Sequence, residues 1–178
     1  LENLLRWTRN QNGKTKIYAT LFNLTPVARQ VVSLFSAIAN AKEIELINRI
    51  EGKFDIFADE DMIKTVLRNL ISNAIKFTYT GGQVELSLAD SGDYWTIYVK
   101  DNGKGIPKDL QAHLLKSDEY ITTYGTHNEK GSGLGLILCR DFIRMNKGKL
   151  HFYSQEGIGT TFYFTIPKAS SSAEAVSR

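Results

Sequence analysis

The sequence has little of several features that would define a specialised class of protein. It contains a single cysteine, Cys139, so no internal disulfide can form, and this thiol falls in an apolar run where a buried structural role is expected. No apolar run approaches the roughly 18 residues needed to span a bilayer, and no signal-peptide pattern opens the chain. We therefore expect a cytoplasmic fragment, whose longer parent protein could be anchored in the inner membrane.

A strong excess of charge is also missing. The chain has 22 Lys and Arg against 19 Asp and Glu, and it lacks the basic stripe that is typical of nucleic-acid binding. Its 178 residues, of which 42% are hydrophobic, can bury one sizeable core. The composition thus predicts one globular domain and no nucleic-acid partner.

The periodic segments predict a mixed α/β domain. Apolar spacing favours helices over 26–42, capped by Thr25, over 60–77, capped by Asp59, and over 134–145. Strands are predicted over 16–22, 45–50, 54–58, 83–89, 94–100, 149–154 and 160–166, with 45–50 and 54–58 forming a hairpin. Because the strands arrive as hairpins, we expect a two-layer α/β (α+β) sandwich, a mixed, mostly antiparallel sheet covered on one face by helices.

The two ends of the chain differ from this domain. Residues 1–13 recur at helical spacing and stop at Asn12-Gly13, which predicts the tail of a longer helix. From 169 to 178 Ser and Ala dominate, which is typical of a flexible tail or linker. Residues 14–168 are left as the folded domain.

The predicted helix 60–77 carries a polar stripe. Asn69, Asn73 and either Lys76 or Phe77 project from one side, opposite a fully apolar face. An exposed stripe would explain each residue alone, but asparagine has poor helix propensity, and this side could instead border a pocket. There Asn73 could complete the shell of a phosphate-bound Mg²⁺, and Lys76 could neutralise phosphate oxygens.

Three glycine-containing loops add further candidates. The loop 101–106 has the composition of a turn, but Asp101 at a strand end could also accept a hydrogen bond from an exocyclic amine. The run 131–136 precedes a helix, and its N–H groups suit a phosphate chain, although it matches neither a Walker A loop nor a Rossmann fingerprint. The loop 157–162 needs no function as a hairpin turn, yet Thr160 could reach a base edge if it lies beside Asp101.

In this order the pieces resemble the N, G1, G2 and Gly-x-Gly-Thr boxes of the GHKL superfamily, over about residues 22–167. Asn69 to Thr78 and Asp101 to Ile106 are most similar to the boxes of histidine kinases, and 1–13 resembles the end of the second helix of their dimerisation and phosphoacceptor domain. The resemblance implies a Bergerat-type fold, a protein histidine kinase, and ATP and Mg²⁺ as cofactors.

The resemblance also implies roles for individual residues. Asn73 would bind Mg²⁺, Asn69 and Lys76 would sit at the phosphates, Asp101 would hold the adenine amine, and residues 104–135 would form the ATP lid. For Lys130 a phosphate contact and a solvated charge remain equally open. The other implied nucleotide-binding residues are Phe77, Gly103, Gly105, Ile106, Gly131, Ser132, Gly133, Leu134, Gly135, Leu136 and Thr160.

Position 69 distinguishes two chemistries. In the ATP-hydrolysing relatives a glutamate at this position activates water, and Asn69 cannot act as a general base. We therefore expect transfer of the γ-phosphoryl group to a histidine outside this chain. None of His113, His127 and His151 is followed by an acidic residue early on an amphipathic helix, as a phosphoacceptor would be.

The expected partners are the dimerisation and phosphoacceptor domain of its own or a partner subunit and a response regulator, with a homodimeric parent. Two alternatives stay open. The lid lacks a clear Phe-x-x-Phe box, with residues 120–124 in its place, which leaves a module that senses ATP, transfers nothing and controls a partner through its lid. A GHKL ATPase is disfavoured by Asn69.

Overall fold

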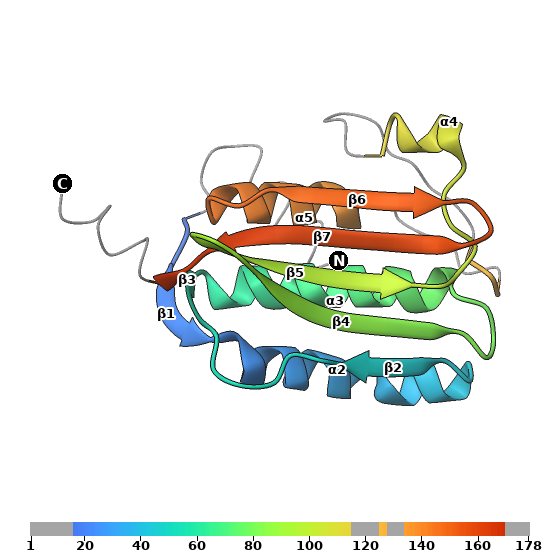
Figure 1. Ribbon diagram of the computed structural model, residues 1–178, viewed down its shortest axis with the longest axis horizontal. Helices are drawn as coiled ribbons and strands as arrows, with labels where there is room; N and C mark the ends of the chain where they lie inside the picture. Colours follow the sequence, from blue (N-terminus) through green and yellow to red (C-terminus); the bar gives the residue numbers. More distant parts are fainter. Residues whose placement is uncertain (1–15, 115–124, 128–133, 170–178) are drawn as a thin grey trace.

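The computed structural model describes residues 16–114, 125–127 and 134–169 (Figure 1). The strands are β1 Thr20–Asn23, β2 Glu45–Asn48, β3 Asp55–Ala58, β4 Gln83–Ser91, β5 Tyr94–Asp101, β6 Leu150–Gln155 and β7 Gly159–Pro167. The helices are α2 Leu24–Ala41, α3 Glu60–Phe77, α4 Lys108–Gln111 and α5 Gly135–Met145. Five strands form one sheet in the order β2-β4-β5-β7-β6, and β1 pairs with β3 in a small second sheet.

The large sheet confirms the predicted fold class. β2 and β4 are parallel, whereas the pairs β4 with β5, β5 with β7 and β6 with β7 are antiparallel. Helices α2, α3 and α5 all lie along one face of the sheet (Figure 1). The side chains alternate accordingly. In β5, Ile97 and Val99 point to the helices and are buried, whereas Lys100 points to the other face and is exposed. The result is two layers around one core.

Helix α3 forms the centre of that core and follows the prediction. It runs from Glu60 to Phe77, and Asp59 caps it by accepting a hydrogen bond from the Met62 N–H at 3.1 Å. Asn146, at the end of α5, accepts from the Asp59 N–H at 2.7 Å and so ties the two helices together. The fully buried side of α3 comprises Ile63, Val66, Leu67, Leu70 and Ile71.

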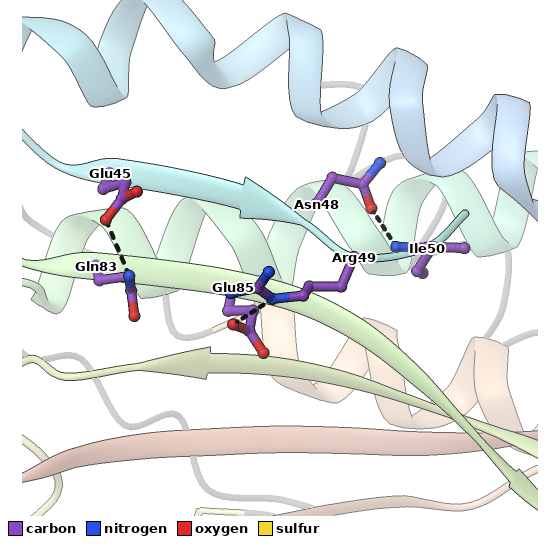
Figure 2. Close-up of polar contacts among 6 residues, drawn as sticks. All are labelled: Glu45, Asn48, Arg49, Ile50, Gln83 and Glu85. Carbon is purple, nitrogen blue, oxygen red and sulfur yellow. Dashed lines mark hydrogen bonds and ion pairs between the residues drawn. The ribbon is translucent and has the colours of Figure 1, made fainter.

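The predicted hairpin between residues 45–50 and 54–58 is wrong. β2 pairs with β4, whereas β3 pairs with β1. After β2, the Arg49 N–H still donates to the Leu86 carbonyl of β4 at 2.8 Å, and the Arg49 side chain bonds Glu85 at 3.0 Å. The Asn48 side chain accepts from the Ile50 N–H at 3.0 Å, which turns the chain (Figure 2). The chain therefore remains hydrogen-bonded to β4 as far as Arg49 and then buries Ile50, and it does not fold back to pair β2 with β3.

Helix α2 begins two residues earlier than predicted, because Asn23 and not Thr25 is its N-cap. The Asn23 side-chain oxygen accepts from the Thr25 N–H at 3.2 Å and from the Phe54 N–H at 3.1 Å. Thr25 instead donates its hydroxyl to the Gly52 carbonyl at 2.8 Å. The bonds to Phe54 and Gly52 join the start of α2 to the segment before β3. The start of α2 therefore depends on contacts that are distant in the sequence.

Some predicted segments lie outside the described residues. These are the helix tail over 1–13, residues 170–178 of the tail, and residues 115–124 and 128–133 of the lid. Among the described residues, no helix has the length and apolar character that crossing a membrane would require.

Candidate nucleotide-binding site

The polar stripe of α3 is only half-buried, in contrast to the other side of the helix. Asn69, Asn73, Lys76 and Phe77 all have intermediate exposure. The Asn69 amide nitrogen donates to the Thr65 carbonyl at 2.8 Å, so the helix itself satisfies that donor. The Asn73 amide makes no hydrogen bond with the described residues. Its oxygen is available to a ligand or a metal ion.

The last turn of α3 meets the loop that follows β5. The Lys104 N–H donates to the Phe77 carbonyl at 3.0 Å. The ammonium groups of Lys76 and Lys104 lie 4.9 and 5.0 Å from the centre of the Phe77 ring. Two cationic side chains thus gather at one aromatic ring, which favours an anionic ligand nearby.

Asp101 ends β5 and is 7% exposed. Its Oδ1 accepts from the Gly103 N–H at 2.9 Å and from the Thr160 N–H at 3.2 Å. The bond to Gly103 is the Asx turn that the composition of this loop predicts. Thr160 lies directly opposite Asp101 on the neighbouring strand β7. The same Asp101 carboxylate therefore forms the turn and is the candidate for binding a base. Both hydrogen bonds use Oδ1, and neither uses Oδ2.

Burial raises the pKa of Asp101 to about 6, although the N–H groups of Gly103 and Thr160 act in the opposite direction. The carboxylate has lost most of its water, and none of the described residues donates to its Oδ2. Such a group gains much from a ligand that donates an N–H.

Three glycines let the loops approach at backbone distance. A Cβ on Gly103 would lie 2.1 Å from the Phe77 carbonyl oxygen, and one on Gly159 would lie 2.1 Å from that of Asp101. Gly105 has a φ of +67°, and its Cβ would lie 2.1 Å from the Gln155 carbonyl oxygen. These glycines are required by contacts within the protein itself, whether or not a ligand approaches them.

The start of α5 lies next to Asn69. A Cβ on Gly135 would be 2.9 Å from the Asn69 side-chain oxygen, and Leu134 and Leu136 on either side are half-buried. The positive end of this helix dipole is therefore beside the polar stripe of α3, where it favours an anion. Lys130, Gly131, Ser132 and Gly133 lie outside the described residues.

The histidines lie elsewhere or at the margin. His151 stacks on Tyr163 on the open face of the sheet, with ring centres 5.4 Å apart. His127 contacts Thr80 at 3.3 Å, and His113 is exposed in the described part of the predicted lid. The structure therefore joins the α3 stripe, the Asp101 loop, the start of α5 and Thr160 without a histidine among them.

A family model described as histidine kinase-, DNA gyrase B-, and HSP90-like ATPase matches residues 58–170. The chain belongs to this family. All the site residues named above fall within the match.

Within the family, the chain is similar to sensor kinases. It is 30% identical over 169 residues to the adaptive-response sensory kinase SasA of Crocosphaera subtropica, covering 94% of this chain and 44% of that protein. It is 31% identical over 171 residues to the circadian input-output histidine kinase CikA of Synechococcus elongatus, covering 94% and 23%. The chain thus spans less than half the length of these relatives.

Solved histidine kinases share the fold. The catalytic domain of ThkA matches with a TM-score of 0.72 at 31% identity, over 85% of this chain and 96% of that chain. Full-length ShkA in complex with AMPPNP matches with a TM-score of 0.77 at 26% identity, over 94% and 35%. ThkA in complex with the response regulator protein TrrA gives 0.72 at 26% identity, over 96% and 49%. The predicted resemblance to the catalytic domain of histidine kinases is confirmed.

Sequence reasoning missed Ser154, which bonds two parts of this ATPase-family site. Its hydroxyl lies 2.9 Å from the Thr160 hydroxyl and accepts from the Ile106 N–H at 2.9 Å. A signal was present, because Ser154 shares the inward-facing side of β6 with Leu150 and Phe152.

Sequence reasoning also missed the residues that cap the end of α3. The buried ammonium group of Lys42 donates to the carbonyls of Ile75 and Lys76, each at 3.0 Å. Thr126 adds its N–H to the Lys76 carbonyl at 3.1 Å, and its hydroxyl donates to the Thr78 carbonyl at 2.9 Å. These donors satisfy carbonyls that a helix end leaves without partners.

The arrangement suits the ATP and Mg²⁺ that the family implies. Asp101 Oδ2 can accept from an amine on the base side, and the Asn73 oxygen can serve on the phosphate side. Among the described residues, no group of three or more His, Cys, Asp or Glu could hold a metal ion. A Mg²⁺ ion held mainly by phosphates and water needs no such group, and an amide oxygen such as that of Asn73 could complete its shell.

Proposed function

We propose that this chain binds Mg-ATP and donates the γ-phosphoryl group to a histidine of a phosphoacceptor domain in two-component signal transduction. The observation that carries the proposal is the buried carboxylate of Asp101, with its raised pKa, beside an α3 stripe that has an amide at position 69. The similarity to a histidine kinase bound to AMPPNP, an analogue of ATP, supports it.

On the base side, Asp101 accepts a hydrogen bond from the exocyclic amine of adenine through Oδ2. Its Oδ1 is already held by the N–H groups of Gly103 and Thr160, so the carboxylate is oriented before the ligand arrives. Thr160 lies next to it and contributes to the same base edge. Preorganised acceptors of this kind select adenine by its amine.

On the phosphate side, positive charge and an amide oxygen act together. Lys76 and the start of α5 offset the charge of the triphosphate. Asn73 supplies its side-chain oxygen to the Mg²⁺ that accompanies the nucleotide. Lys130, Gly131 and Gly133 are further residues that we propose to contact the phosphates.

The reaction is transfer and not hydrolysis. The unprotonated ring nitrogen of a histidine attacks the γ-phosphorus, the bond from that phosphorus to the oxygen of ADP breaks, and the other ring nitrogen loses its proton to water. Asn69 cannot take a proton from water, and its amide nitrogen is bound to the Thr65 carbonyl. The site therefore positions the phosphate donor without activating a competing water molecule.

The proposed partners are a dimerisation and phosphoacceptor domain and a response regulator. ThkA, which shares this fold, is a histidine kinase that was solved with a response regulator protein. We place the chain in a homodimeric parent, with the catalytic domain in the cytoplasm.

The test incubates the chain with Mg-ATP and a histidine-containing phosphoacceptor domain, joined or added separately. The expected product is an acid-labile, base-stable phosphohistidine that disappears with Asn73→Ala. Release of inorganic phosphate as the sole product would instead indicate an ATPase. Tight ATP binding without any transfer would indicate a nucleotide-sensing module.

A further inference from the structure

Ser154 lies in a row of buried polar side chains that leads to the candidate base site. It sits on β6 opposite Thr160 on β7, which in turn lies opposite Asp101 on β5. The three residues are 9%, 6% and 7% exposed, respectively. Buried polar side chains in adjacent strands are retained when their hydrogen bonds are satisfied. The hydrogen bonds of Ser154 therefore determine whether the Thr160 hydroxyl can donate to a ligand or only accept from one.

The Ser154 hydroxyl joins three backbone or side-chain groups. Its oxygen accepts from the Ile106 N–H at 2.9 Å. It also lies 3.1 Å from the Gly159 carbonyl oxygen and 2.9 Å from the Thr160 hydroxyl oxygen. A hydroxyl has one hydrogen, so Ser154 donates either to Gly159 or to Thr160, but not fully to both.

These two arrangements give Thr160 opposite properties. If Ser154 donates to the Gly159 carbonyl, Thr160 must donate to Ser154 and has only lone pairs for a ligand. If Ser154 donates to Thr160, the hydrogen of Thr160 is available to a third group. Adenine presents an amine donor beside ring nitrogen 1, which is an acceptor. The second arrangement therefore complements adenine, with Asp101 as acceptor and Thr160 as donor.

We propose that Ser154 is a positioning residue for adenine recognition, which donates to Thr160 and so directs the Thr160 hydroxyl hydrogen to ring nitrogen 1. The inference rests on the proposed ATP binding and adds to it the group that orients Thr160. The same hydroxyl holds the Ile106 N–H, so it fixes the loop after β5 at the same time. Ser154 itself does not contact the nucleotide.

The test compares the affinity of the whole chain for ATP and for 1-deaza-ATP, in which a C–H group replaces ring nitrogen 1. Calorimetry in the presence of Mg²⁺ gives both dissociation constants. Wild-type protein should prefer ATP by about tenfold, the size of one net hydrogen bond. Thr160→Val should abolish this preference, and Ser154→Ala should reduce it to about threefold or less, because the Thr160 hydroxyl loses its fixed orientation. Ser154→Thr keeps a hydroxyl and should retain most of the preference.

A purely structural role of Ser154 would weaken both nucleotides equally and leave their ratio unchanged, and that result would overturn the inference. It is also overturned if Thr160→Val keeps the preference. The double variant should show the same ratio as Thr160→Val alone, since the two residues act in series. If Ser154→Ala does not fold, Ser154→Cys, with its weak donor, should show the same loss. Wild-type protein that binds neither nucleotide would refute the proposed function itself.

Discussion

The two sides of the candidate site differ in how much of their hydrogen bonding is completed by folding. On the base side, Asp101 and Thr160 are buried and bonded to each other and to their neighbours. On the phosphate side, Asn73 is half-buried, and its side chain has no hydrogen bond with the described residues. Folding thus orients the groups that we propose to choose the base, whereas it leaves the Asn73 side chain without a hydrogen bond to the described residues.

The base side carries an energetic cost that the phosphate side lacks. A carboxylate whose pKa rises from 3.8 to about 6 is less stable in its charged form than it would be in water. This difference corresponds to a cost on the order of 2–3 kcal/mol in unfolding free energy at neutral pH. Preorganisation at Asp101 is therefore obtained at the expense of stability.

The largest expected effect comes from replacing Asp101 by asparagine, which removes the charge but keeps the shape. We expect Asp101→Asn to lower ATP affinity about 100-fold, because an amide nitrogen would then face the adenine amine and a charged hydrogen bond is lost. The same variant should raise the free energy of unfolding at pH 7 by about 1–2 kcal/mol, since no buried charge remains. Calorimetry and urea denaturation measure the two quantities.

A binding loss accompanied by lower stability would mean that Asp101 acts through the fold and not through the ligand. Asp93→Asn provides the control, because Asp93 is exposed in the turn between β4 and β5. It should change neither quantity appreciably.

The next effect concerns Lys42, which caps the end of α3 next to the proposed phosphate-binding residues. Lys42→Met removes the ammonium group that caps the Ile75 and Lys76 carbonyls. We expect the free energy of unfolding to fall by about 2 kcal/mol, because the carbonyls lose a charged donor at the negative end of the α3 dipole. Urea denaturation measures this, with the exposed Lys149→Met as the matched control. Equal midpoints for both variants would show that the cap contributes nothing.

A smaller effect is expected from Asn73, whose side chain has no hydrogen bond with the described residues. Asn73→Ala should cost less than about 0.5 kcal/mol of stability, because its amide bonds to none of the described residues. It should lower ATP affinity in Mg²⁺ by about tenfold, to the value that wild-type protein shows with EDTA.

Ser72→Ala, on the exposed side of the same turn, should leave the affinity unchanged. If Asn73→Ala remains fully sensitive to Mg²⁺, the metal is held by another residue.

The sequence predicted those features that depend on local periodicity. Helix α3 with its Asp59 cap was predicted correctly because cap and apolar stripe are contiguous in the chain. The pairing of β2 with β4 was missed, since residues far apart in the sequence compete with a local turn. Lys42 and Thr126 gave no signal, because each reaches carbonyls at least 33 residues away.

The candidate site was predictable to a similar degree. Sequence reasoning treated the adjacency of Asp101 and Thr160 only as a condition for a role of Thr160, and the structure meets it, because the two residues lie opposite each other on β5 and β7. The roles of these residues toward a nucleotide remain predictions. Ser154 was predictable in principle, since a polar residue on the buried side of a strand requires an explanation.

The smallest effect tests whether the base side depends on the charge of Asp101. A protonated Asp101 cannot accept through both oxygens, so affinity should fall as the pH drops through about 6. Between pH 7.5 and 5.5 the ionised fraction falls to about one quarter, which predicts about a fourfold loss. Adenosine is the suitable probe, because it has no phosphate that titrates in this range. The Asp101→Asn variant should show no such dependence.

The stability of the free protein should change in the opposite direction over the same range. Because the folded pKa of Asp101 lies above the unfolded value, the folded state binds a proton more readily. The contribution of this group to the unfolding free energy therefore rises as the pH falls from above 6 toward 4. As the pH falls, adenosine should therefore bind more weakly while the free energy of unfolding increases. Opposite trends of this kind would show that the charged form of Asp101 serves binding and lowers the stability of the fold. The phosphate side, which has no group of this kind among the α3 residues Asn69, Asn73 and Lys76, should show neither trend.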